Sequence, residues 1–129
     1  EHARCPATEF LCNAKHDVVS RCFSAIDCKM MADMRVTEPD NDIALFMMQM
    51  IPHHRNAVDM AKILLKYGPS EMGWETGAEE GDLDIPALAW AIINTQTQQI
   101  MDMEAWLEKY AYTADYCPWN VQEVVVEGE

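Results

Sequence analysis

The stretch that decides the fold is residues 42–67, which read DIALFMMQMIPHHRNAVDMAKILLKY. On an α-helix, which turns about 100° per residue, its apolar and histidine side chains gather within an arc of about 140°. That arc holds Met47, Met50, His53, His54, Ala57, Met60, Ala61 and Leu64. Met48 and most charged side chains fall outside it, and so does Pro52, which lacks an N–H and should kink the helix. The sequence therefore predicts an amphipathic helix that directs methionine and histidine toward a core.

Polar and helix-breaking segments on both sides of this stretch predict two further helices. Asp40 or Asn41 can cap the central helix at its start, and Gly68–Pro69 can end it. Pro86 fits the first turn of the next helix. We therefore expect one domain over residues 1–129, an all-α antiparallel up-down bundle. Its long helices are expected over about 15–36, 42–67 and 86–110, with a possible short helix before residue 15. The remaining parts are a cysteine-rich N-terminal region at 5–36, which includes the first helix, an acidic loop at 68–85 and a tail at 112–129.

The two flanking helices carry inward stripes of their own. The first stripe consists of His16, Val19, Phe23, Ile26, Met30 and Met34. The second consists of Ile92, Gln96, Gln99, Ile100, Met103, Leu107 and Tyr110. If antiparallel helices pair about their connecting loops, Met30 and Met103 come to the height of Met47 and Met50, to within about one helical turn. We expect these thioethers to meet His54 in one layer.

The charge balance limits the partners of the chain. Its 129 residues include 9 basic and 22 acidic side chains, for a net charge of −13. Such a chain lacks the basic patch that nucleic acid or an anionic membrane surface requires. No apolar run approaches the ~20 residues that span a membrane. The expected partners are a metal cation, a protein with a basic face or a second copy of the chain.

The cysteines predict the compartment. Four of the five lie at positions 5, 12, 22 and 28, and the fifth is Cys117. In a small domain this clustering favours disulfides in an oxidising compartment, and hence a secreted, periplasmic or lumenal protein. The chain begins at Glu1 rather than methionine, which suggests that a leader has been removed. Because the tail has little apolar periodicity, we predict a bridge from Cys117 to one of the N-terminal cysteines.

The ten methionines are the strongest chemical signal. Thioethers are soft ligands that select Cu(I), and imidazole is a common metal ligand. His53 and His54 point about 100° apart on a helix, so they are expected to serve different sites. The first site would use Met47, Met50, His54 and Met103, with Met30 nearby, and the second would use His53 and Met60. The alternative is a methionine-filled core whose histidines are hydrogen-bonded to neighbouring helices.

Two strings in this region resemble a known family. They are Met50-Ile51-Pro52-His53-His54-Arg55-Asn56-Ala57-Val58-Asp59-Met60-Ala61, and Gln96, Ile100, Met103, Trp106 and Leu107 in that order. Together they resemble the domain-of-unknown-function 305 family over about residues 42–110. The resemblance implies a ferritin-like helical bundle, copper binding as in some bacterial periplasmic members, and a site lined by Met50, His53, His54, Met60, Gln96 and Met103. Gln99 stands where members usually carry Glu, the 68–85 loop is longer than usual, and the cysteine-rich N-terminal region and the tail have no counterpart.

No catalytic pattern accompanies these residues. Glu-x-x-His and His-Glu-x-x-His are both absent, as is a phosphate-binding loop. We therefore expect a metal-binding protein rather than an enzyme, one that sequesters, buffers or delivers Cu(I) or Ag(I). The alternative function is a disulfide-stapled structural or interaction module, and a copper redox enzyme ranks last. The candidate metal ligands are Met30, Met34, Met47, Met50, His53, His54, Met60, Gln96 and Met103.

Overall fold

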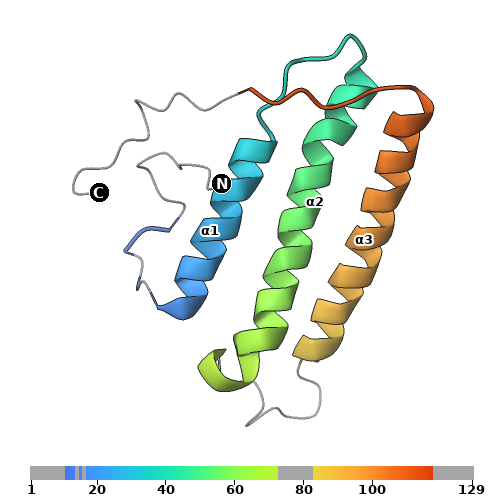
Figure 1. Cartoon of the computed structure of the whole chain (residues 1–129). Helices are drawn as coiled ribbons and strands as arrows, with labels where there is room; N and C mark the ends of the chain where they lie inside the picture. The colour runs from blue at the N-terminus through green and yellow to red at the C-terminus, as the bar shows by residue number, and fades with distance from the viewer. Residues whose placement is uncertain (1–10, 14, 16, 73–82, 118–129) are drawn as a thin grey trace.

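The described part of the protein is a bundle of three long α-helices (Figure 1). A computed structural model describes residues 11–13, 15, 17–72 and 83–117. Within them, α1 spans Val18–Asp33, α2 spans Asp42–Tyr67 and α3 spans Ile85–Lys109. A π-helical turn, η1 at Gly68–Met72, continues the chain beyond α2. The all-α prediction is thus confirmed; the possible short helix before residue 15 and most of the acidic loop lie outside the described residues.

Side-chain caps explain where the three helices begin. Asp17 accepts a hydrogen bond from the backbone N–H of Ser20 at the start of α1. Asn41, rather than Asp40, caps α2, and its Oδ1 accepts from two backbone N–H groups. Asp84 caps α3 directly before the proline-containing first turn. Each cap satisfies backbone donors that have no partner within the helix, which fixes the first residue of the element.

The three helices form a layer with α2 in the middle. Figure 1 shows α1 rising, α2 descending and α3 rising again, so neighbours run in opposite directions. Both α1 and α3 pack against α2, and the α2–α3 interface is the more extensive. The two outer helices have little direct contact with each other. The central helix therefore has one flank on α1, the other on α3, and two faces between them.

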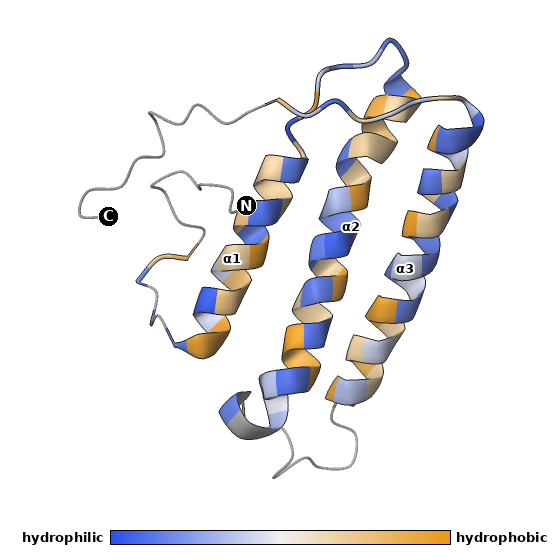
Figure 2. Ribbon diagram, viewed as in Figure 1, coloured by the Kyte–Doolittle hydropathy of each residue, from blue (hydrophilic) through white to orange (hydrophobic). Residues whose placement is uncertain are grey.

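The core lies between α2 and α3, and side chains of the segment after α3 pack against it. Its buried side chains are Ala44, Met48, Ile51, Val58, Ala61, Ala89, Ile93, Ile100 and Leu107. Met48 and Pro52 are buried, although the sequence placed them outside the apolar arc. His53 and Met60 were expected inside and are exposed. Of the eight residues in the predicted inward arc, only Ala61 is buried, so the predicted direction of the core from this helix is wrong. The buried face of α2 is formed instead by Ala44, Met48, Ile51, Pro52, Val58 and Ala61. Figure 2 shows hydrophilic residues recurring along the middle of α2.

Backbone pairing holds the tail that follows α3. Val36 and Tyr116 form an isolated antiparallel β-bridge. On either side of it, the N–H of Thr37 donates to the carbonyl of Asp115 at 2.6 Å, and the N–H of Cys117 donates to the carbonyl of Arg35 at 2.8 Å. We call this contact between residues 35–37 and 115–117 the clasp. It ties the segment that follows α3 to the connection between α1 and α2.

The thiols correct one prediction. Cys117 is free, and its Sγ lies 3.8 Å from the hydroxyl of Thr37, so the predicted disulfide from the tail is wrong. The hydrogen bonds of the clasp, rather than a disulfide, attach the tail to the bundle. Cys28 is disulfide-bonded, while Cys12 and Cys22 are free. None of the helices in the described ranges combines the length and apolarity needed to cross a membrane.

Candidate metal site

A histidine on α2 and a glutamine on α3 define the centre of the site. The Nε2 atom of His54 lies 2.7 Å from Oε1 of Gln99. An amide oxygen can only accept, so Nε2 donates this hydrogen bond, and in the neutral imidazole Nδ1 then keeps a free lone pair. Nδ1 is buried and has no hydrogen-bond partner. The histidine thus presents an unused nitrogen ligand inside the helical layer.

This hydrogen bond also fixes the register between α2 and α3. Because the helices run antiparallel, the turn before His54 faces the turn after Gln99 (Figure 1). Those turns carry Met50 and Met103. Met50 is partly buried, and Met103 packs against the core. The register therefore places two thioethers one turn from the free nitrogen of His54.

Two more predicted ligands border this centre. Gln96 is partly buried and lies one turn from Gln99 on the same stripe of α3. Met47 packs against the core at the other end, two turns from His54, which is about 10 Å along the helix. Met47 therefore belongs to the far end of the methionine layer, whereas Met50 lies beside the histidine.

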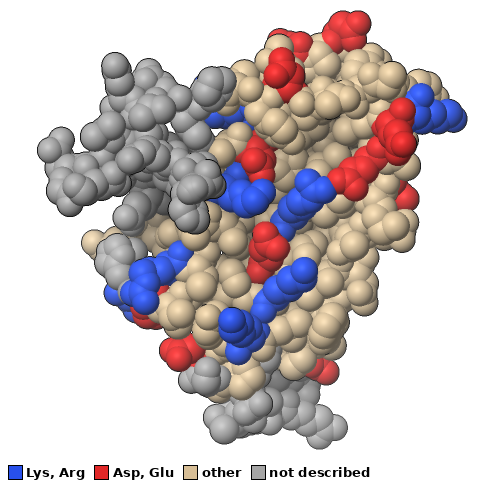
Figure 3. Space-filling view, viewed as in Figure 1, with Lys and Arg blue, Asp and Glu red and all other residues tan. Residues whose placement is uncertain are grey.

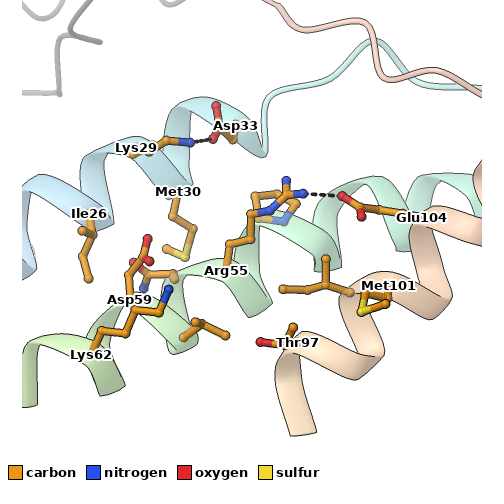
Figure 4. Close-up of a pocket in the computed structure, with 14 residues that line it drawn as sticks. Ile26, Lys29, Met30, Asp33, Arg55, Asp59, Lys62, Thr97, Met101 and Glu104 are labelled. Carbon is orange, nitrogen blue, oxygen red and sulfur yellow. Dashed lines mark hydrogen bonds and ion pairs between the residues drawn. The ribbon is translucent and has the colours of Figure 1, made fainter. Parts of the chain in front are cut away.

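The methionines of α1 do not join this layer. Met30 lines a groove of about 430 Å³, here called the groove, together with Pro52, Arg55, Asp59, Thr97 and Met101 (Figure 4). None of the other candidate ligands lines it. Met34 lies on the α1 flank of α2, where its carbonyl accepts a hydrogen bond from Gln49. The sequence predicted how far along the bundle axis these residues lie, by pairing the helices about their connecting loops. It could not show that α1 and α3 pack on different flanks of α2.

His53 and Met60 also stand apart from the centre. His53 is exposed, and its ring centroid lies 6.2 Å from that of His54. Met60 is 38% exposed, and its sulfur lies 3.8 Å from Nδ2 of Asn56. Both residues belong to the face of α2 that neither α1 nor α3 covers. A single chain therefore leaves the predicted second site open to solvent.

Comparison with known proteins identifies the family. The family model described as a domain of unknown function, DUF305, matches residues 42–119. The chain belongs to this family. The match covers α2, α3 and the clasp residues of the tail, and α1 precedes it. No curated protein and no solved structure matches the chain.

The groove is lined by several charged side chains, whereas the residues assigned to the site at His54 are neutral. Arg55 and Glu104 form an ion pair across α2 and α3 that borders the groove. Figure 3 shows basic and acidic side chains interspersed over one broad face of the layer. In the described part of the chain, no three His, Cys, Asp or Glu side chains come close enough together to hold a metal ion. The donors around His54 are instead neutral: an imidazole, thioethers and amides.

Gln99 is the residue that sequence reasoning missed. It was placed on the correct stripe of α3 but was not counted among the site residues. Two signals pointed to it: its position between Gln96 and Met103, and its correspondence to a residue that is usually Glu in the family. The structure gives it a definite task, because its oxygen selects which nitrogen of His54 carries the proton.

Proposed function

We propose that this protein binds Cu(I), or Ag(I), between α2 and α3 through His54, Met50 and Met103. The observation that carries the proposal is the buried Nδ1 of His54, which has no partner. An unsatisfied buried polar atom costs about 1–3 kcal/mol, so a native protein keeps one where it has a use. A metal ion bound to Nδ1 would satisfy it.

The neighbouring donors support a soft ion. Thioethers and neutral imidazole favour Cu(I), whereas Mg²⁺ and Ca²⁺ require oxygen ligands. Ligating histidines usually donate their second ring N–H to a carbonyl or carboxylate oxygen, which orients the ring. Gln99 occupies that place at His54. The ion would thus be held by side chains of two helices whose register is already fixed.

A disulfide supports a location outside the cytoplasm, and the net charge supports the binding of a cation. Cys28 is disulfide-bonded, and disulfides persist in oxidising compartments. The net charge of −13 attracts cations to the molecule. Sequestration, buffering or delivery of copper in a secreted, periplasmic or lumenal compartment is consistent with both.

Titration with Cu(I) against a competing chelator tests the proposal. Leu in place of Met preserves most of the volume, so a Met50→Leu/Met103→Leu double variant is expected to fold. Its affinity for Cu(I) should fall by more than roughly 100-fold. Loss of a residue that only orients a ligand lowers metal affinity by at most about that factor, and loss of two ligands should cost more. The matched control is Met31→Leu/Met101→Leu, which removes two thioethers from other places in the fold and should bind like the parent. If the two double variants bind equally well, the methionines are core packing and the structural module is the better description.

A further inference from the structure

The exposed face of α2 carries a regular apolar seam. Alternating steps of three and four residues connect eight positions from Ile43 to Tyr67. Four of them are Ile43, Met50, Ala57 and Leu64, and the other four are Phe46, His53, Met60 and Tyr67. This spacing is the heptad pattern with which one helix packs against another. We call these eight residues the seam.

Contacts within the chain occupy the positions on both sides of the seam. On one side, Gln49 and Asn56 reach α1, where they bond the carbonyl of Met34 and the carboxylate of Asp27. On the other side, His54 reaches Gln99 of α3. The seam between them stays open: Ile43 is 54% exposed, Phe46 is 57% exposed, and His53 is exposed as well. Met60 is exposed too, whereas the other four seam residues are partly buried, and Leu64 among them packs against the core.

The composition of the seam is unusual for this protein. None of its eight residues is charged, although the chain has a net charge of −13. Two copies of such a chain repel each other over most of their surfaces. A charge-free helix face is where two copies can meet with the least repulsion, whereas a partner with a basic face would favour the acidic surface.

The seam is also complementary to itself. Its steps read the same from either end, because they are symmetric about Arg55, which lies on the opposite side of the helix. In an antiparallel pair, Phe46 would face Leu64, Met50 would face Met60, and His53 would face the small Ala57. Ile43 would face Tyr67 in the outermost layers. Such self-matching is what a two-fold interface requires.

We infer that the seam binds the seam of a second copy of this chain, with the two α2 helices antiparallel. Leu88 extends the contact onto α3, since it is 38% exposed and lies on the same stripe as Gln99. Each chain contributes its α2–α3 hairpin, and the two hairpins together enclose the methionine layers. The dimer buries the apolar side chains that one chain leaves in water.

The pairing completes a second soft site, an inference that rests on the proposed function. Within one chain, His53 and Met60 are both exposed. In the antiparallel pair, Met60 of the partner subunit comes opposite Met50 and beside His53. The donors of this shared site are then the imidazole of His53 and the thioether of the partner's Met60, because Met50 already belongs to the site at His54. By symmetry the dimer contains two such sites.

The first test measures the mass of the metal-free protein, with its free thiols blocked. Sedimentation should give about twice the chain mass of 14.7 kDa. Phe46→Glu should reduce the mass to that of one chain. Trp90→Glu is the matched control, because Trp90 is 54% exposed and shares its stripe of α3 with the groove residues Thr97 and Met101. A parent with the mass of one chain, or equal effects of both substitutions, overturns the inference.

A second test determines the direction of pairing. Phe46→Glu and Leu64→Lys should each abolish the dimer when alone. Mixing the two variants should restore it in the antiparallel arrangement, because one layer gains a Glu–Lys pair and its symmetry mate keeps Phe46 against Leu64. Circular dichroism confirms folding before mixing, and Ile43→Glu with Tyr67→Lys replaces the pair if Leu64→Lys does not fold. Absence of a mixed dimer between folded variants contradicts the antiparallel seam.

The shared site has a separate readout. Met60→Leu should keep the dimer mass and lower the number of Cu(I) ions bound per chain, while Met101→Leu should change neither. An unchanged copper count in Met60→Leu refutes the shared site. Because the mass is measured without metal, failure to bind copper and failure to dimerise remain distinguishable.

Discussion

Replacement of Gln99 by Leu tests the role of the hydrogen bond that orients His54. The substitution removes the oxygen that accepts from Nε2 at 2.7 Å. With Nδ1 already unpartnered, the ring then has no hydrogen bond to fix its tautomer. Loss of such an outer partner typically lowers metal affinity by about 10–100-fold, which corresponds to roughly 1.4–2.7 kcal/mol. Because Gln99 itself is exposed, water can replace part of the lost bond, so we expect the lower half of that range.

The assay combines Cu(I) competition with nitrogen NMR of the histidine ring. In the metal-free parent, His54 should show a protonated Nε2 and a bare Nδ1. In Gln99→Leu, the two neutral tautomers of the His54 ring should become more equally populated, and Cu(I) binding should weaken at the same time. Gln99→Glu retains an acceptor at the same place and should restore both readouts. If Gln99→Leu leaves the tautomer and the affinity unchanged, Gln99 does not position the ligand and the reasoning fails.

Three further predictions concern stability. Asn41→Ala should lower the free energy of unfolding by about 1 kcal/mol in urea, because two backbone N–H groups at the start of α2 lose their acceptor; an unchanged midpoint would show that the cap contributes nothing. Met48→Ala should cost about 2–5 kcal/mol, since Met48 is 5% exposed, whereas Met60→Ala should cost much less in a single chain; similar losses would contradict the observed core. The backbone N–H of Ser20 lowers the pKa of Asp17 below its usual 3.8, so this cap contributes stability above that pH and loses it as the pH falls through the lowered value. Asp17→Asn should therefore flatten the acid end of the stability profile, and an unaltered acid limb would count against this cap.

The sequence predicted the elements well because their signals are local. The central helix has the predicted bounds, 42–67, and Asn41 caps its start as expected. Gly68–Pro69 does not stop the winding of the chain, because Gly68 has helical backbone angles and the chain continues as the π-helical turn η1. The third helix begins one residue before its proline, as a proline in the first turn requires. These features need no knowledge of the rest of the fold.

The placement of the methionines could not be predicted in the same way. Periodicity shows which residues share a stripe, but not which stripe another helix covers. Met48 is buried on the side of α2 that faces Leu107 of α3 and the segment after α3, whereas Met30 lines the groove from α1. Both facts depend on how the three helices pack against one another. Only the cross-helix contact between His54 and Gln99 reveals the register from which the site is built.

The clasp sets a mechanical limit on the α2–α3 hairpin. It joins residues 35–37 to residues 115–117 and so closes the chain into a ring that contains both helices. Sliding α3 along α2 by one turn, about 5.4 Å, would pull the tail away from Thr37 and break these hydrogen bonds. The clasp therefore acts as a stop that keeps His54 opposite Gln99. Because it consists of backbone hydrogen bonds and Cys117 is a free thiol, a reductant cannot release it by breaking a tail disulfide.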